Sequence, residues 1–159
     1  MSNLFTVGIG DACIIKMPDV LVTYALGSCV GVCLYDFRNH IAGMVHMLLP
    51  ARHDIQNSNE YKFADSGISK LLEQMLQQGA NKKSIVAKIA GGAEMFSTYG
   101  LQSSGIGLKN VEAVIKVLKT AGIPIVAQDT GKNFGRSIWF KAKDGSLEVK
   151  TVNHGTYVI

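Results

Sequence analysis

The chain has 159 residues, 47% of them hydrophobic, which suits one compact domain over residues 1–159 with a substantial core. Its formal net charge of +4 comes from 16 Lys and Arg residues scattered along the chain, so we expect no nucleic-acid partner. No apolar stretch reaches the roughly 20 residues that span a bilayer, and three cysteines, an odd number, do not suit a secreted disulfide framework. We therefore expect a cytoplasmic protein with reduced thiols and no membrane insertion.

The first half of the chain predicts strands. Its short segments are rich in β-branched residues and are separated by Gly, Pro and Asn. Strands are expected over residues 4–9, 12–17, 20–26, 30–36 and 41–49. A hairpin turn is expected at 37–40, and the polar residues 50–59 predict a loop directly after the strand that carries His46.

Two amphipathic helices are expected in the second half. Apolar residues recur at helical spacing over 64–76 and again over 111–121, with Gly79 and Gly122 as stop signals. Each helix should therefore lay one face on a sheet.

Strands are also expected around these helices, at 85–90, 123–128, 137–141 and 147–151, the last two joined by a turn at Asp144 and Gly145. Many strands followed by helix, strand, helix and strands predict a layered α+β fold rather than a doubly wound parallel sheet.

A cysteine stands at a sharp corner between two of the predicted strands. Gly27 and Ser28 can turn the chain because glycine tolerates positive φ, and Cys29 follows them. A thiol there can be exposed at a sheet edge, with backbone N–H groups near Gly27 and Ser28 free to bind an oxyanion. The alternative is a structural thiol, since free cysteine is among the most buried residue types. Cys33 would share the sheet face of Cys29, but two ligands without a third do not make a zinc site.

His46 is an isolated histidine in an apolar predicted strand, and such a residue is usually part of the core. Beside a thiol, an imidazole can act as the cation that favours the thiolate or as the base that takes its proton, and can then protonate departing ammonia. Thr23, in the strand before the corner, can orient the imidazole more weakly than a carboxylate would. On its own Thr23 is explained by β-propensity.

These residues resemble those of the CheD family of chemoreceptor glutamine deamidases, and the likeness extends over nearly the whole chain. It rests on short blocks that occur in the family's order: Thr23, Gly27-Ser28-Cys29, His46, Leu49-Pro50, Ala64-Asp65, Lys88-Ile89-Ala90-Gly91-Gly92-Ala93, Met95-Phe96, Ile106-Gly107, Asn110-Val111-Glu112, Asp129-Thr130-Gly131 and Gly135-Arg136. Each block alone is weak, but all of them in order make chance a poor explanation.

The resemblance implies a cysteine-dependent protein-glutamine glutaminase that deamidates glutamine side chains of methyl-accepting chemotaxis receptors to glutamate. Its catalytic trio would be Thr23, Cys29 and His46, with a Cys29 thioester, His46 as acid and base, and no cofactor or metal. The implied fold is a layered α/β sandwich with mixed β-sheets, akin to the cytotoxic necrotizing factor type of cysteine hydrolase. The implied partners are the cytoplasmic helices of chemoreceptors and a CheC-type phosphatase.

Two other functions remain open at this point. The chain can be a non-catalytic chemotaxis module that binds receptors or the phosphatase, or a thiol amidase that acts on small molecules. A deep narrow pocket would favour the small-molecule amidase, and an open groove would favour a glutamine carried on a helix. Phe63, Lys109 and Lys132 depart from the tyrosine, arginine and glycine that are common in the family, and they bear on substrate docking.

Overall fold

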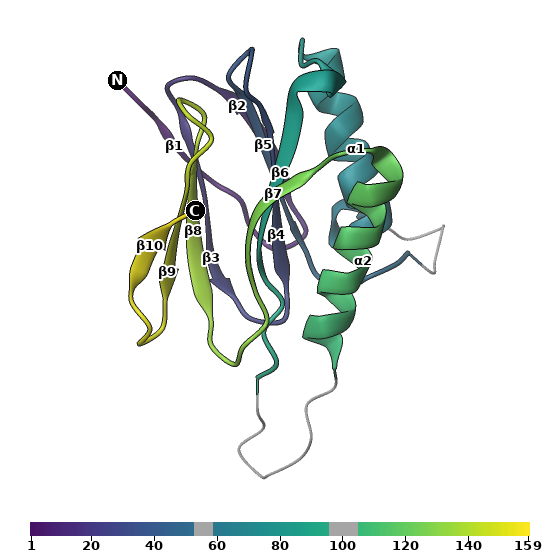
Figure 1. Cartoon of the computed structure of the whole chain (residues 1–159), viewed down its shortest axis with the longest axis vertical. Coiled ribbons are helices and arrows are strands. Elements are labelled where there is room, and N and C mark those ends of the chain that lie inside the picture. Colours follow the sequence, from purple (N-terminus) through teal and green to yellow (C-terminus); the bar gives the residue numbers. More distant parts are fainter. Residues whose placement is uncertain (53–58, 96–104) are drawn as a thin grey trace.

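The structure, a computed structural model, describes residues 1–52, 59–95 and 105–159. The described strands form two five-stranded sheets, and two helices cover one of these sheets (Figure 1). The molecule therefore has three layers, which are sheet A, sheet B and the helices. Phe96 and most of the expected 50–59 loop lie outside the described residues.

Sheet A has the strand order β1-β3-β8-β9-β10. Its members are β1 (Leu4–Thr6), β3 (Val20–Leu26), β8 (Arg136–Lys141), β9 (Leu147–Thr151) and β10 (Thr156–Val158). Strands β1 and β3 pair in parallel, and the other neighbours are antiparallel.

Sheet B has the strand order β2-β5-β4-β6-β7. Its members are β2 (Ala12–Lys16), β5 (Ile41–Met47), β4 (Val30–Asp36), β6 (Ile85–Gly91) and β7 (Ile125–Thr130). Only β6 and β7 pair in parallel. Both sheets are mixed, so the predicted layered α+β class with mixed sheets is confirmed.

The helices α1 (Ala64–Gln77) and α2 (Ile106–Ala121) lie on the outer face of sheet B (Figure 1). Short 3-10 turns, η1 (Glu60–Lys62) and η2 (Lys82–Ser84), precede α1 and β6. As the sequence predicts, α2 ends at Gly122, which caps it in the left-handed conformation. None of the described helices is long and apolar enough to cross a membrane.

Two clusters of apolar side chains fill the spaces between the layers. The helix-side cluster joins α1 and α2 to sheet B and includes Val32, Ile68, Leu71 and Val114. The inter-sheet cluster lies between sheets A and B and includes Cys29, Cys33, Met44, Ile138 and Phe140. Strand β4 contributes to both clusters because its successive side chains point to opposite faces.

Several predicted bounds differ from the observed ones. Strand β1 ends at Thr6 rather than at residue 9, β7 begins at Ile125, and α2 begins ahead of its apolar repeat. Strand β10 was not predicted, because all three of its side chains are exposed and give no alternation of apolar and polar residues.

Candidate active site

The corner that carries Cys29 joins β3 of sheet A to β4 of sheet B. Cys29 is only 7% exposed and belongs to the inter-sheet cluster. The expected position at a sheet edge is therefore wrong, because β4 is the middle strand of sheet B and has a paired neighbour on each side. The thiol lies at the end of the inter-sheet layer, where its strand begins.

The turn after β6 holds this corner from one side. The Gly92 N–H donates to the Cys29 carbonyl (2.8 Å) and the Ala93 N–H donates to the Gly27 carbonyl (2.9 Å). Gly91, with a φ of +112°, lies so close that a Cβ on it would overlap the carbonyl oxygen of Cys29. The backbone of the corner is thus fixed by contacts that depend on a glycine at position 91.

His46 lies on β5, and its imidazole is bonded to Thr23 of the opposing sheet. Thr23 Oγ1 is 2.7 Å from His46 Nδ1 and donates to the carbonyl of Val7 at 2.6 Å. A hydroxyl has a single hydrogen, so Thr23 accepts from His46, which assigns the proton to Nδ1. The Nε2 atom is then an unprotonated acceptor. It is buried and has no hydrogen-bond partner among the described residues.

Strand register places Cys29 and His46 on the same face of sheet B. Gly31 pairs directly with His46, and Cys29 precedes Gly31 by two positions, which makes Cys29 a diagonal neighbour of His46. Gly31 faces sheet A, where a Cβ would be 2.7 Å from Ile138 Cδ1 and 3.8 Å from Thr23 Cγ2. A larger residue at position 31 would push the two sheets apart where Thr23 meets His46.

Burial keeps both reactive groups neutral in this structure. It raises the pKa of the Cys29 thiol, although the residue's own backbone N–H opposes the effect, and it lowers the pKa of His46 to about 4. No hydrogen bond joins the thiol to Nε2 among the described atoms. Of the two roles open to the imidazole, the structure therefore favours a neutral base over a cation that holds a preformed thiolate.

The other cysteines lie away from the corner. Cys33 is fully buried in the middle of β4, and burial raises its pKa. Cys13 is half-buried on β2, and both residues are free thiols. Within the described ranges, no group of three His, Cys, Asp or Glu side chains is arranged to hold a metal ion.

A groove of about 850 Å³ adjoins the corner at Gly27. It is lined by aromatic side chains, among them Tyr24 and Trp139, whose rings meet edge to face at 6.0 Å, and by the cationic Lys150. None of the described residues that line it is Asp or Glu. The groove extends from Gly27 along β3, β8 and β9, and neither Cys29 nor His46 is among its described lining residues.

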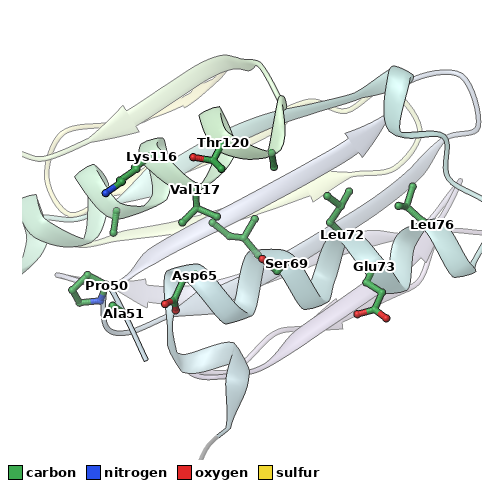
Figure 2. A pocket seen from close by; sticks show the side chains of 13 residues that line it. Pro50, Ala51, Asp65, Ser69, Leu72, Glu73, Leu76, Lys116, Val117 and Thr120 are labelled. Carbon is green, nitrogen blue, oxygen red and sulfur yellow. The ribbon is translucent and has the colours of Figure 1, made fainter. Parts of the chain in front are cut away.

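A second hollow, of about 700 Å³, lies between α1 and α2 and is lined by residues such as Leu72 and Val117 (Figure 2). The helices cover the face of sheet B opposite to the one that carries His46. This hollow is therefore separate from the candidate active site.

The three departures from the family pattern lie outside the contacts made by Cys29 and His46. Phe63 precedes α1 and bridges to Leu49, and Lys109 is exposed on α2. Lys132 has a φ of +63°, a conformation that glycine adopts more easily.

Sequence reasoning missed four groups of the site, which are the Val7 carbonyl, Gly31, Gly91 and Asn110. The carbonyl has no side-chain signal, and the two glycines matter only through neighbours that are distant in sequence. Asn110 had a usable signal, because it lies four residues before Val114 and so places a polar side chain on the apolar face of the predicted helix.

Comparison with known proteins points to one family. A family model described as CheD chemotactic sensory transduction matches residues 48–151. Proteins named "Probable chemoreceptor glutamine deamidase CheD" are 51% identical in Caldanaerobacter subterraneus subsp. tengcongensis, over 99% of both chains, and 42% identical in Desulfitobacterium hafniense, over the full length of both. A relative of the same name in Haloarcula marismortui is 42% identical over 92% of this chain and 84% of its own.

Among solved structures, the crystal structure of Bacillus licheniformis hypothetical protein YfiH is similar over 76% of this chain. The match spans 50% of the YfiH chain, with 18% sequence identity and a TM-score of 0.47.

Proposed function

This chain belongs to the CheD family, and from that premise we propose that it deamidates glutamine side chains of chemoreceptors to glutamate, with Cys29 as nucleophile. The relatives named chemoreceptor glutamine deamidase support the reaction. The observation that carries the residue assignment is the buried, unpartnered Nε2 of His46 on the sheet face of Cys29. Such an orphaned acceptor costs about 1–3 kcal/mol, and its use as the base for the thiol accounts for it.

In the first half of the reaction, the Cys29 thiol gives its proton to His46 Nε2 while sulfur attacks the carboxamide carbon of the glutamine. A C–S bond forms, and the carbonyl oxygen becomes an oxyanion. When the tetrahedral intermediate collapses, the C–N bond breaks and ammonia leaves with the proton from Nε2. A thioester remains on Cys29.

In the second half, water attacks the thioester carbon and gives a proton to His46 Nε2. The C–S bond breaks, sulfur takes back a proton, and the product is glutamate. Burial lowers the pKa of His46 to about 4, so Nε2 carries no proton at neutral pH and can accept one, although an imidazole of this pKa is a weaker base than an exposed one. Small movements on substrate binding would close the distance between thiol and imidazole.

The backbone of the corner is suited to stabilise the oxyanion. The carbonyls of Gly27 and Cys29 point toward the turn after β6. In a trans peptide the N–H is opposite to the C=O, so the amide of Ser28 points away from that turn. Among the described residues the Ser28 amide has no acceptor, which leaves it available for an oxyanion, whereas the Cys29 amide faces its own sulfur.

Thr23 orients the imidazole in this scheme. Its hydroxyl holds the Nδ1–H tautomer, and the hydroxyl is itself directed by the Val7 carbonyl. A neutral hydroxyl stabilises an imidazolium less than a carboxylate does, so its contribution is mainly the choice of tautomer.

The proposed substrate is a glutamine on the cytoplasmic helices of a receptor, docked along the open aromatic groove beside Gly27. No described residue that lines the groove is acidic, which suits an acidic partner surface, and a CheC-type phosphatase would be a second partner. Binding energy from the helix around the glutamine would place the carboxamide against the thiol.

The test is incubation with an intact receptor cytoplasmic fragment, followed by peptide mass spectrometry of its glutamines and an ammonia assay. A short unstructured peptide with the same glutamine should react much more slowly, and rising salt should slow the intact fragment. Equal efficiency on fragment and peptide would favour a small-molecule amidase. Binding without any deamidation would favour a non-catalytic module.

A further inference from the structure

We propose that Asn110 is a positioning residue that sets the separation between the Cys29 corner and the end of the His46 strand. The inference rests on the proposed roles of Cys29 and His46. Asn110 lies on α2 and is fully buried. Its Nδ2 donates to the Ser28 carbonyl at 2.9 Å and to the Leu48 carbonyl at 3.0 Å.

The two acceptors belong to the chain segments that carry the reactive groups. Ser28 directly precedes Cys29, and Leu48 directly follows β5, which carries His46. One planar amide with both hydrogens bonded therefore spans the two segments at a fixed distance. A flipped amide would turn its oxygen toward two carbonyl oxygens, so the observed orientation is the favourable one.

Asn110 links the two segments just beyond the last pair of the β4–β5 ladder. The register between β4 and β5 ends at the pair Val30 and Met47, and the next pair along the strands would be Cys29 with Leu48. In place of further ladder bonds, the Asn110 amide links the two segments across this gap. The corner is thereby held while the Cys29 side chain stays free to react.

A role in stability alone does not explain the choice of asparagine. Asn110 is the only polar residue among the buried residues of the described α1 and α2. Its Oδ1 is buried without a partner among the described residues, and that carries a desolvation cost which an apolar residue would avoid. What asparagine adds is a pair of N–H donors to the backbone carbonyls of Ser28 and Leu48.

The test uses Asn110→Ala and the isosteric Asn110→Asp, with Val114→Ala as the matched control. Val114 is one turn further along α2, fully buried, and packed in the helix-side cluster, so its truncation weakens α2 without touching the corner. Four quantities are measured. They are kcat and KM on the receptor fragment, the alkylation rate of Cys29 relative to Cys13 in the same molecule, and the midpoint of thermal unfolding.

Both Asn110 variants should lower kcat about 10- to 100-fold with little change in KM, since a displacement of about 1 Å at the reacting atoms has that effect. The relative alkylation of Cys29 should rise several-fold, because the corner opens and exposes the thiol. In Asn110→Asp this rise should shrink as pH falls, since the protonated carboxyl regains one donor. Val114→Ala should lose stability and keep both kcat and the alkylation ratio.

The proposal is overturned if the Asn110 variants change kcat and the alkylation ratio no more than Val114→Ala does. Should Asn110→Ala fail to fold, Asn110→Asp alone decides. Alkylation needs no receptor, so it still tests the positioning role if the wild-type chain proves unable to deamidate. In that case an altered ratio supports positioning by Asn110, and an unaltered ratio refutes it.

Discussion

The two faces of sheet B are covered by different kinds of buried side chain. Toward the helices, the buried side chains of α1 are all apolar, and α2 adds one polar residue, Asn110. Toward sheet A, the buried set includes Thr23, His46 and Arg136 beside apolar neighbours. Each of these three polar side chains makes at least one hydrogen bond, yet His46 Nε2 and Arg136 Nη2 remain without a partner among the described residues.

The difference separates a face that stabilises the fold from one that holds the candidate site. Apolar packing against the helices contributes roughly 25 cal/mol per Å² of buried area, and Asn110 Oδ1 is the one buried side-chain polar atom of the described α1 and α2 that lacks a partner. On the inter-sheet face, an imidazole and a thiol are buried where apolar side chains would stabilise the fold more. Their burial there shifts their pKa values. Substitutions on the two faces should therefore affect different measurements.

The largest loss of activity should come from Cys29→Ala, a substitution on the inter-sheet face. Activity on a receptor fragment should vanish while the unfolding midpoint stays near that of the wild type, because only the attacking sulfur is removed. Cys33→Ala, on the same sheet face, and Cys13→Ala should keep activity, as measured by ammonia release. Full activity of Cys29→Ala would end the thioester mechanism.

His46→Ala should lower kcat by at least about 100-fold, since acid-base catalysis contributes roughly 10² to 10⁴ and the imidazole here also takes the thiol proton. The control is His40→Ala, in the 37–40 turn at the other end of β4, where His40 Nδ1 bonds the Tyr35 hydroxyl at 2.8 Å. Steady-state kinetics of both variants should separate them. A similar loss in the two would show that the effect is structural.

On the helix side, Leu71→Ala should destabilise the fold by about 2–5 kcal/mol through the cavity it leaves. Leu71 is fully buried in the helix-side cluster, and neither Cys29 nor His46 belongs to that cluster. Urea unfolding would measure the loss, and kcat per folded molecule should be unchanged. A drop in kcat with unchanged stability would show that the two faces are not separable.

The strands that make this comparison possible were largely predictable from the sequence. The bounds of β3 and β4 match the prediction because each is a short, mainly apolar run bounded by turn residues, and the Gly27-Ser28 turn separates them. The helix α1 was recognised from its apolar repeat and its glycine stop. The candidate residues Thr23, Cys29 and His46 were chosen largely because they resemble those of a family.

Strand order and register were not predictable, because they are set by contacts between residues distant in sequence. Strand β3 lies between β1 and β8 in sheet A, and this brings Val7 to Thr23. The central position of β4 in sheet B turned an expected exposed thiol into a buried one. Local pattern indicates that a residue is apolar or polar, but not which neighbours will bury it.

Acid should weaken the inter-sheet face through His46. Its folded pKa of about 4 is below the ordinary value of about 6.5, so the unfolded chain binds the proton first as pH falls. The contribution to stability is complete above about pH 6.5 and is lost between about pH 6.5 and pH 4, to a total of about 3 kcal/mol. Urea unfolding of wild type and His46→Gln across this range should give a smaller slope for the variant, and equal slopes would contradict the burial of a neutral imidazole.

The smallest effect is expected at Thr23, whose hydroxyl lies between the Val7 carbonyl and His46 Nδ1. In Thr23→Ala both buried groups lose their partner, and the imidazole is free to place its proton on Nε2, where it cannot accept from the thiol. A net hydrogen bond contributes about 1 kcal/mol, so we expect kcat to fall by about fivefold, far less than for Cys29→Ala. Thr23→Ser retains the hydroxyl and should restore most of the activity, whereas Thr23→Val, which keeps the shape, should not. NMR of the His46 ring nitrogens would report the tautomer directly. If Thr23→Val kept both the Nδ1–H tautomer and wild-type kcat, the orientation of His46 would have to come from the packing of the two sheets rather than from the hydroxyl.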